Sequence, residues 1–456
     1  MNKIVDIGLG NQITLEKAQL PAQLLEQIRV YLTMPNPKYE EAKKRDYPTW
    51  GLPPSLFACY EDHDYLYAYR GYMGSLVSFL KESELHYHLI DDRRKLSEIN
   101  LTFLGTLRPY QERAVGDTLK KDFGVLVAPC GSGKTVMACN IMAERKQPTL
   151  IIVHTKELLN QWRDRIIQYL GIPSDEIGQI GAGKEIIRPV TVGMVQTLVK
   201  RDLDEIRTHF GQIVIDEVHH TPSTTFTEIV RTFDSQYMLG LSATPYRRDG
   251  LNKLIYLSVG NMVAEVTGVE LQDAGNRIKP EIVVRETNFD FDYNEDSDYQ
   301  PMISELIENF DRNDLIATDV ASEYDGENFE LVLSDRKAHL DFLYDLLTEK
   351  GVKAEILTAD VPKKKREQII RDFESGALRV ILATGQLAGE GLDMPRLNRL
   401  FVTTPIRWKG RVIQYAGRAL RVTEGKYNTR IYDYHDCNVG ILSSSFRLRY
   451  RIYDRL

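Results

Sequence analysis

The chain has 456 residues, a length that predicts about three domains, and 43% of its residues are hydrophobic, as in ordinary globular proteins. A net charge of −7 argues against a large surface that coats nucleic acid nonspecifically, and no apolar run is long enough to predict a transmembrane helix. Four cysteines without metal-ligand spacing and a start without a signal-peptide core predict reduced thiols, no zinc or iron–sulfur site, and a cytoplasmic location.

The first hundred residues predict a small α+β module. Strand-like runs at Leu56–Tyr60 and Tyr65–Tyr69 flank a polar turn, a helical pattern covers Met73–Leu80, and His86–Ile90 is again strand-like. Aromatic rings can stack on bases while cations meet phosphates, so interleaved basic and aromatic residues predict a nucleic-acid contact. These residues are Lys43, Lys44, Arg45, Tyr47, Trp50, Arg70 and Tyr72. The alternative is that the tyrosines pack in the module's core and the charges are solvated.

A glycine-rich turn, A-P-C-G-S-G-K-T at residues 128–135, follows the apolar run Val125–Val127 and precedes a helical pattern. In that context backbone N–H groups and the helix dipole bind phosphates. Lys134 is placed to reach the β- and γ-phosphates, and the Thr135 hydroxyl is placed to hold Mg²⁺. Ala128 stands where the usual pattern has its first glycine. The predicted phosphate-binding residues are Pro129, Cys130, Gly131, Ser132, Gly133, Lys134 and Thr135.

A β-branched run at residues 213–215 ends in Asp216 and Glu217. Ligands gather at the carboxyl ends of the strands in a parallel sheet. Asp216 is therefore placed to hold Mg²⁺, and Glu217 is placed to orient the attacking water. A strand-end acidic pair alone is weak evidence, but its position after a phosphate-binding turn favours a catalytic role.

Three later segments complete a series. Residues 239–245 read L-G-L-S-A-T-P, residues 383–385 lead into Gly389–Asp393, and Gln414–Arg421 closes the series. Arg418 and Arg421 are three residues apart, so both project from one helix face, where two guanidinium groups suit recognition of a polyphosphate. An isolated pair of this kind is more often a solvated surface pair.

In this order and spacing, the segments resemble the motifs of superfamily 2 helicases and translocases. Ser242–Pro245 followed by Arg247–Gly250 is similar to the XPB, RadD and UvsW branch. The resemblance implies a DExH-type motor that uses ATP and Mg²⁺. Catalytic roles are implied for Lys134, Asp216, Glu217, Gln414, Arg418 and Arg421, and nucleotide contacts for Arg108, Gln111, Gly391 and Asp393.

The resemblance also implies residues that grip the nucleic-acid backbone or couple it to the ATP site. The grips are Thr155, Lys156, Gln196, Thr197 and Thr384, and the coupling residues are His219, Ser242 and Thr244.

The expected fold class is α/β, with two tandem RecA-like doubly wound parallel-sheet domains after the small N-terminal α+β domain. The predicted boundaries are 1–100, 101–265 and 266–456. The acidic stretch 288–298 suits a loop or hinge. The tail Phe446–Tyr453 alternates arginine with apolar residues, which predicts an edge strand with one basic face or a nucleic-acid contact.

The predicted function is an ATP-dependent DNA helicase or translocase, with 3′–5′ polarity, that remodels forks and junctions in replication, recombination or repair. The branched substrate follows from the resemblance to UvsW-type helicases, whose DNA-contacting module the segments Arg70-Gly71 and Asp92–Arg94 weakly resemble. Expected partners are DNA and replication or recombination proteins, and a monomer is the default. The alternatives are an RNA helicase, the motor subunit of a restriction or defence complex, and a nucleotide-gated binding module without catalysis.

Overall fold

The computed structural model describes residues 4–44, 46–129, 131–218, 229–243, 251–275, 278–294, 298–385, 394–405 and 428–453. The chain forms two compact units, residues 1–128 with 133–266 and residues 129–132 with 267–456. None of the described helices is long and apolar enough to cross a membrane.

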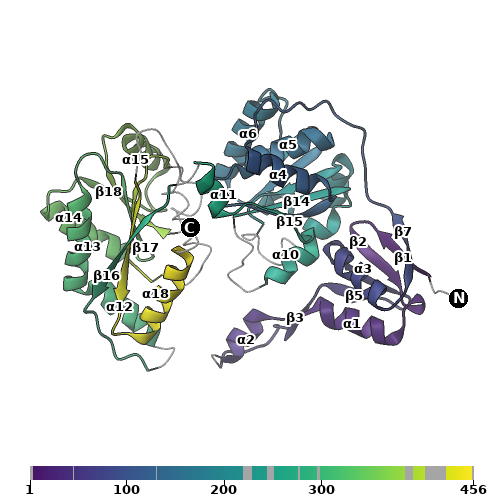
Figure 1. The fold of residues 1–456 in the computed structure, drawn as a ribbon, viewed down its shortest axis with the longest axis horizontal. Helices are drawn as coiled ribbons and strands as arrows, with labels where there is room; N and C mark the ends of the chain where they lie inside the picture. Colours follow the sequence, from purple (N-terminus) through teal and green to yellow (C-terminus); the bar gives the residue numbers. More distant parts are fainter. Residues whose placement is uncertain are drawn as a thin grey trace. The chain divides into compact units, whose positions relative to one another are not determined.

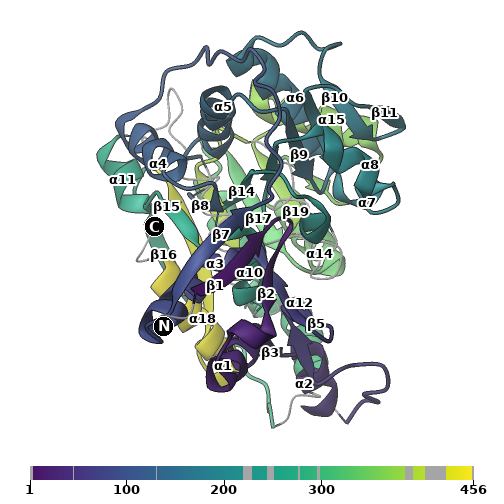
Figure 2. The same ribbon diagram turned by 90° about the vertical axis from the view of Figure 1, so that its right-hand side faces the viewer.

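The N-terminal module is built on a five-stranded sheet in the order β5–β6–β2–β1–β7. Its strands are β1 (Ile4–Leu9), β2 (Gln12–Glu16), β5 (Cys59–Glu61), β6 (Tyr65–Tyr69) and β7 (His86–Asp91). Only the β1–β7 pair is parallel (Figure 2). Apolar residues alternate along β1 and β2, so one face of the sheet is apolar and packs against α1 (Ala22–Leu32) and α3 (Met73–Glu82). The predicted helix and last strand of this module are confirmed, and β5 and β6 form the predicted hairpin with a shorter first strand.

An arm, which we define as Asn36–Pro54, extends from this module (Figure 1). It lies between β3 (Thr33–Pro35) and β4 (Ser55–Phe57), which pair antiparallel, and it contains α2 (Pro37–Lys44). Asn36 closes the base of the arm, because its backbone N–H donates to Pro54 O at 3.0 Å and its Nδ2 donates to Pro53 O at 2.7 Å. The predicted strand at residues 56–60 is therefore divided between β4 and β5, which belong to different sheets.

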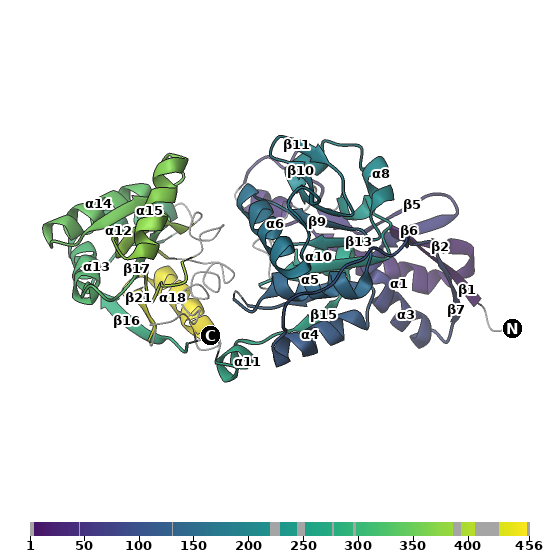
Figure 3. The ribbon, with the colours of Figure 1, turned by 90° about the horizontal axis from the view of Figure 1, so that it is seen from above.

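The first α/β domain has an eight-stranded sheet in the order β11–β10–β12–β9–β13–β14–β8–β15, parallel except at β11 (Figure 3). Helices cover both faces, so the central strands are buried on both sides and read as continuous apolar runs. The strands are β8 (Phe123–Val127), β9 (Thr149–Val153), β10 (Gly178–Gly181), β11 (Lys184–Ile186), β12 (Val190–Met194), β13 (Gln212–Ile215), β14 (Tyr237–Ser242) and β15 (Met262–Glu265). The described helices include α4 (Pro109–Leu119), α5 (Lys134–Arg145), α6 (Lys156–Leu170), α7 (Val195–Leu198), α8 (Leu203–Ile206) and α10 (Asn252–Val259).

The second unit has a six-stranded, all-parallel sheet in the order β16–β21–β20–β17–β19–β18. Alternate residues of β17 and β19 enter two separate apolar cores, one with α15 and α18 and one with α13 and α14. Figure 1 shows α13 and α14 on one side of this sheet and α18 on the other. The strands are β16 (Glu281–Thr287), β17 (Glu330–Ser334), β18 (Ala354–Leu357), β19 (Val380–Thr384), β20 (Arg399–Val402) and β21 (Arg430–Asp436). The described helices of this unit are α11 (Gly268–Asp273), α12 (Tyr299–Glu308), α13 (Phe310–Glu323), α14 (Lys337–Glu349), α15 (Lys363–Ser375) and α18 (Gly440–Tyr453). Two doubly wound parallel sheets after a small α+β module confirm the predicted fold class.

The C-terminal tail is helical, so the predicted edge strand is wrong. Arg449 on α18 is 2% exposed and forms two hydrogen bonds with Asp433, at 2.7 and 2.8 Å. Tyr453 Oη donates to the same carboxylate at 2.7 Å. A nucleic-acid contact by Arg449 is also excluded, because its side chain is buried in an ion pair with Asp433 that links α18 to β21.

The N-terminal module packs tightly on the first α/β domain. Leu251, Leu254 and Leu257, in and beside α10, belong to the module's own apolar core. At Gly71 a Cβ atom would lie 2.1 Å from Tyr256 O and 2.7 Å from Leu257 O, so only glycine allows the backbones to approach this closely.

Arg70 serves this docking and does not contact nucleic acid, so that prediction is wrong. Its side chain is 1% exposed, and it donates to Ser235 O at 3.0 and 3.1 Å and to Phe233 O at 3.3 Å. Burial, beside the cationic Arg93, lowers the pKa of the Arg70 guanidinium to about 9. Arg94 forms a bidentate pair with Asp234, at 3.0 Å for both bonds.

The other residues of the module that were predicted to contact nucleic acid differ in their solvent exposure. Tyr72 is 0% exposed and packs in the core, as the alternative interpretation had it. Tyr47 and Trp50 lie on the arm and are 61% and 96% exposed. Lys43 and Lys44 are also exposed, whereas Arg45 lies outside the described residues.

Candidate active site

The sequence-predicted segments of the first α/β domain meet at one edge of its sheet. The strands lie in the order β12–β9–β13–β14–β8 and are all parallel, so their carboxyl ends share that edge. The residues that follow these ends are Gln196 after β12, Thr155 after β9, Asp216 after β13 and Ala128 after β8, while Ser242 ends β14. Topology thus brings together residues that are up to 114 positions apart in sequence (242 − 128).

The phosphate-binding turn has the local geometry that its glycines predict. Gly131 and Gly133 both have φ of 84°, a left-handed conformation that glycine adopts without steric cost. Gly133 is the N-cap of α5, so the first turn of this helix offers N–H groups without intrahelical partners. The start of the turn is fixed by a hydrogen bond from Ala128 N–H to Ser242 O at 2.9 Å. Cys130 lies outside the described residues.

Gln111 lies directly against this turn. A Cβ atom on Gly133 would approach Gln111 Nε2 to 2.4 Å, so the glycine makes room for the amide. Gln111 Oε1 accepts the Arg108 N–H at 2.9 Å in a capping box at the start of α4, which orients the amide group. Arg108 Nη1 donates to Tyr110 Oη at 3.3 Å. The adenine-side role of Arg108 and Gln111 stays a prediction.

Lys134 bridges the turn and the acidic pair. Its Nζ donates to Ala128 O at 3.2 Å and lies 3.7 Å from Glu217 Oε1. The Lys134 and Glu217 side chains are 11% and 18% exposed, so this attraction is screened less than a surface ion pair. The structure therefore brings the predicted phosphate-binding lysine and the predicted water-orienting carboxylate together.

Asp216 is 8% exposed and its two carboxylate oxygens have different donors. Oδ1 accepts the Glu217 N–H at 2.9 Å, and Oδ2 accepts Trp162 Nε1–H at 2.8 Å. Burial, together with the neighbouring Glu217 carboxylate, raises the pKa of Asp216 to about 6. Sequence reasoning missed Trp162, which lies on α6 and looks in the sequence like an ordinary core residue of an amphipathic helix.

The donor set at this edge fits Mg²⁺. A hydroxyl on Thr135 and a carboxylate on Asp216 are hard oxygen ligands, the kind that Mg²⁺ prefers. Each Asp216 oxygen carries one hydrogen bond and so retains a lone pair for a further partner. Glu217 adopts φ of 46°, a left-handed backbone that is unusual for a residue with a side chain.

The candidate backbone grips lie at the neighbouring strand ends. Thr155 is the N-cap of α6, and its Oγ1 accepts Leu158 N–H at 3.2 Å. Gln196 Nε2 donates to His154 O at 2.8 Å, which ties the start of α7 to the end of β9. Lys156 and Gln196 are exposed, and Thr197 lies beside Gln196 on α7. In the second unit, Thr384 ends β19 opposite Ser334 of β17.

Several predicted site residues lie outside the described residues, and their roles stay predictions from the resemblance. They are His219, Thr244, Gly391, Asp393, Gln414, Arg418 and Arg421.

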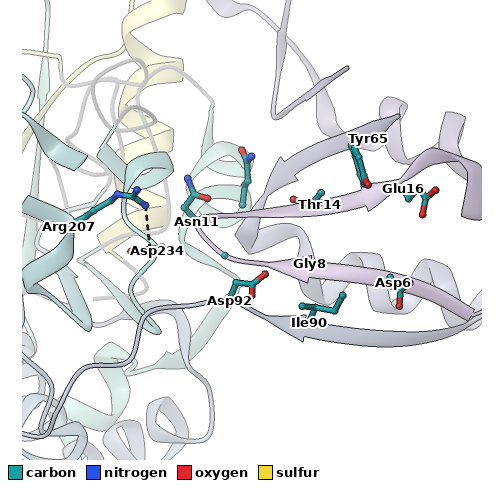
Figure 4. A pocket seen from close by; sticks show the side chains of 12 residues that line it. Asp6, Gly8, Asn11, Thr14, Glu16, Tyr65, Ile90, Asp92, Arg207 and Asp234 are labelled. Atoms are coloured by element: carbon teal, nitrogen blue, oxygen red, sulfur yellow. Dashed lines mark hydrogen bonds and ion pairs between the residues drawn. The ribbon is translucent and has the colours of Figure 1, made fainter. Parts of the chain in front are cut away.

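A separate hollow of about 540 Å³ lies beside the N-terminal sheet (Figure 4). Asp6, Glu16, Asp92 and Asp234 line it, and Arg207 pairs with Asp234 at 3.3 Å. An acidic lining of this kind repels phosphate, so this hollow is not a candidate site for a nucleotide or a DNA backbone.

Two family profiles match the chain. The first, ResIII, is described as "Type III restriction enzyme, res subunit" and matches residues 104–247. The second, Helicase_C, is described as "Helicase conserved C-terminal domain" and matches residues 311–423. The first match contains β8 to β14 of the first sheet, and the second contains β17 to β20 of the second sheet.

Curated relatives extend this similarity. The DNA 3′-5′ translocase XPB2 of Sulfurisphaera tokodaii is 30% identical over 350 residues, which cover 69% of this chain and 78% of that protein. A protein of Acanthamoeba polyphaga mimivirus with the provisional name ATP-dependent RNA helicase L396 is 32% identical over 369 residues, 75% of this chain and 65% of that protein. The chain thus spans 78% of the length of the first relative and 65%, slightly less than two thirds, of the length of the second.

Two solved structures were matched to the chain, and one of them supports the fold. A fragment of an HsdR subunit, provisionally assigned to a type I restriction enzyme of Vibrio vulnificus, aligns with 76% of this chain and 66% of that chain at 21% identity and a TM-score of 0.57. The crystal structure of T4 UvsW aligns with 99% of this chain and 97% of that chain, but 17% identity and a TM-score of 0.46 are too low to assign a role to the N-terminal module. The family profiles and the XPB2 relative, on a fold with a phosphate-binding turn and an acidic pair at one sheet edge, show that the chain belongs to the superfamily 2 ATP-dependent helicases, with XPB-type proteins among its relatives.

Proposed function

We propose that this protein is an ATP-driven DNA translocase or helicase that remodels branched DNA such as forks and junctions. The observation that carries the proposal is the arrangement of the first sheet's edge. Residues for ATP chemistry follow β8 and β13, and candidate backbone grips follow β9 and β12, so β13 and β9 place the two functions on adjacent strands. A structural change at the bound nucleotide would therefore need to pass only between two neighbouring strands to reach the candidate nucleic-acid contacts.

The proposed chemistry uses residues whose positions suit phosphoryl transfer. The first turn of α5 and Lys134 would bind the β- and γ-phosphates, and Thr135 and Asp216 would hold Mg²⁺. When bound, the metal neutralises charge on the phosphate oxygens. Glu217 would orient the attacking water, since its carboxylate lies beside Lys134 and follows Asp216 directly.

A structural change at the bound nucleotide would be transmitted to the residues that hold the nucleic-acid backbone. Ser242 ends β14, which lies between the phosphate-binding strand and the acidic strand, so it can respond to both. By resemblance, Arg418 and Arg421 would assist ATP hydrolysis, and arginines in this role contribute about 10³–10⁵ in rate. Thr155, Lys156, Gln196 and Thr384 would hold the nucleic-acid backbone, which gives traction without sequence readout.

The branched substrate is supported by the arm. Trp50 and Tyr47 are 96% and 61% exposed, and stacking on an aromatic side chain stabilises an unpaired base by about 1–3 kcal/mol. The arm belongs to a module that is fastened to the motor domain through Gly71 and Arg70. Movement of that domain would therefore carry the arm along the track, toward the point where strands separate.

The test is steady-state ATPase activity with no nucleic acid, single-stranded DNA, linear duplex, a fork, a four-way junction and RNA. Lys134→Ala is the blank. Stimulation by forks or junctions above linear duplex is the expected result. Equal stimulation by linear and branched DNA would overturn the branched substrate, and stimulation by RNA alone would overturn DNA as the track, in favour of the RNA helicase that the name of the mimivirus relative suggests.

Arm variants separate the module's contribution from that of the motor. Trp50→Ala and Tyr47→Ala are expected to lower fork stimulation and leave stimulation by single-stranded DNA intact. Phe310→Ala is a matched control for Tyr47→Ala, because it removes an aromatic ring of similar exposure, 59%, from the second unit. Loss of fork stimulation in the control as well would assign the effect to general surface change.

A further inference from the structure

Trp162 connects the start of α6 with the acidic pair of the ATP site. It lies on α6, is 1% exposed, and donates its Nε1–H to Asp216 Oδ2 at 2.8 Å. A tryptophan that only filled the core would need no particular acceptor, although a buried indole N–H does need some partner. Here the partner is the carboxylate proposed to hold Mg²⁺.

The hydrogen bond completes a fixed orientation for that carboxylate. The Asp216 backbone is held by a bond from its N–H to Ile152 O at 3.0 Å, and Oδ1 is held by the Glu217 N–H at 2.9 Å. Trp162 holds the other oxygen, so rotation of the carboxylate breaks at least one bond. Such outer contacts orient metal ligands, and their loss typically costs about 10–100-fold in metal affinity or activity.

The same helix begins at the candidate nucleic-acid grips. Thr155 caps α6 and Lys156 is its first residue, so Trp162 lies six residues farther on (162 − 156), or about 9 Å along the axis. Leu159 and Ile166 are buried on the same helix and pack it against the domain, so α6 moves as one body. A small shift of α6 on nucleic-acid binding would change the Trp162–Asp216 contact directly.

We propose that Trp162 is a positioning residue that orients Asp216 for Mg²⁺ and transmits occupancy of the α6 N-terminus to the ATP site. The proposal deepens the function proposed above and rests on Asp216 as the metal ligand. It differs from a packing role in one respect: the N–H group matters, and the bulk of the ring alone does not suffice.

The test compares Trp162→Phe, which keeps an aromatic ring and removes the N–H, with Ile166→Val, which removes one buried methylene from the same helix. Thermal unfolding first establishes that both variants fold. ADP binding is then measured by calorimetry with Mg²⁺ and with EDTA, and the ratio of the two affinities reports the metal. Trp162→Phe is expected to lose about 10-fold or more of the Mg²⁺-dependent gain, and Ile166→Val is expected to keep it.

A second measurement addresses transmission. ATPase activity is recorded with and without DNA over a range of Mg²⁺ concentrations. In Trp162→Phe the Mg²⁺ concentration required for activity should rise about 10-fold, and the ratio of ATPase activity with DNA to activity without DNA should decrease. Both quantities should stay near the wild-type values in Ile166→Val. If Trp162→Phe does not fold, 3-benzothienylalanine at position 162 keeps the ring shape and lacks the N–H.

The outcomes separate this inference from the function on which it rests. A wild-type protein whose ADP binding and ATPase activity do not depend on Mg²⁺ would contradict the proposed function itself. A Mg²⁺-dependent wild type with an unchanged Trp162→Phe, or with equal losses in Trp162→Phe and Ile166→Val, would overturn the role of Trp162 alone.

Discussion

Replacing Gly71 by alanine should separate the N-terminal module from the motor domain. The added Cβ would lie 2.1 Å from Tyr256 O, 2.6 Å from Gly260 N and 2.7 Å from Leu257 O. All three are backbone atoms around the C-terminal end of α10, so no side-chain rotation relieves the clash. Gly71 is not in the left-handed region, so alanine can adopt its backbone conformation and the effect is one of contact alone.

The size of the effect follows from how far the backbones must move. The 2.1 Å contact requires the module and α10 to separate by about 1 Å, which loosens the apolar core that Leu254 and Leu257 share with the module. Overpacking costs about 1–3 kcal/mol, and more when it involves rigid backbone. We expect a loss of about 3 kcal/mol, which lowers the midpoint of thermal unfolding by about 6 °C or more for a unit of this size.

Gly74→Ala is the matched control, three residues farther along the chain. Its Cβ would meet only Asn261 Nδ2, at 3.4 Å, and it lies within α3, where alanine is favoured over glycine by about 0.5–1 kcal/mol. This variant should therefore unfold at the wild-type temperature or slightly above it.

Two measurements check the prediction: thermal unfolding of the full chain, and the rate of tryptic cleavage at Lys95, in the connection between β7 and α4. Gly71→Ala should unfold earlier and be cut faster than wild type, and Gly74→Ala should do neither. Wild-type stability and cleavage in Gly71→Ala would refute the close contact between the module and α10.

Further substitutions test the interior of the second unit and the ATP site. Glu330 is 0% exposed, its oxygens have no partner among the described residues, and burial raises its pKa to about 9 from 4.5. As pH rises above 4.5, Glu330 therefore lowers the free energy of unfolding of the chain, by about 4 kcal/mol at pH 7.5. Glu330→Gln should raise the urea midpoint at pH 7.5, and this increase should become smaller toward pH 5. Burial lowers the pKa of His339 to about 3 from 6.5. As pH falls below 6.5, this histidine therefore becomes protonated in the unfolded chain but stays neutral in the folded chain. Stability should drop by about 2 kcal/mol between pH 7.5 and pH 5, and His339→Gln should flatten that dependence in urea titrations, whereas an unchanged slope would contradict it. Lys134→Ala should abolish ATP hydrolysis, and Arg418→Ala should reduce it severely while ADP binding persists, with wild-type turnover in Arg418→Ala as the contradicting result.

Much of the motor architecture could be predicted because parallel strands leave a strong local signal. Strands buried on both faces read as continuous apolar runs, as at Val125–Val127 and Ile213–Ile215. Asp216 directly follows β13, and Lys134 follows β8 after the glycine-rich turn, so locating these strands also locates the candidate site residues near their carboxyl ends. Gly131 and Gly133 mark the turn because few other residues tolerate its backbone conformation.

What could not be predicted depends on partners that are distant in sequence. Arg70 looks like a solvent-facing cation, but its acceptors are carbonyls 163 and 165 residues away. Arg449 alternates with apolar neighbours as in a strand, and only its pairing with Asp433 shows why a helix carries it inward. Trp162 likewise reads as core packing until the fold supplies Asp216 as its acceptor.

The backbone conformation of Glu217 matters when variants of this protein are selected for thermal stability. With φ of 46°, this position suits glycine better than glutamate, yet the proposed chemistry requires the carboxylate. A variant such as Glu217→Gly would relieve the strain and fold more stably while losing the carboxylate that we propose orients water. Libraries sorted for thermal resistance alone would therefore collect inactive proteins at this position, and a screen that ranks variants by melting temperature needs a turnover assay beside it.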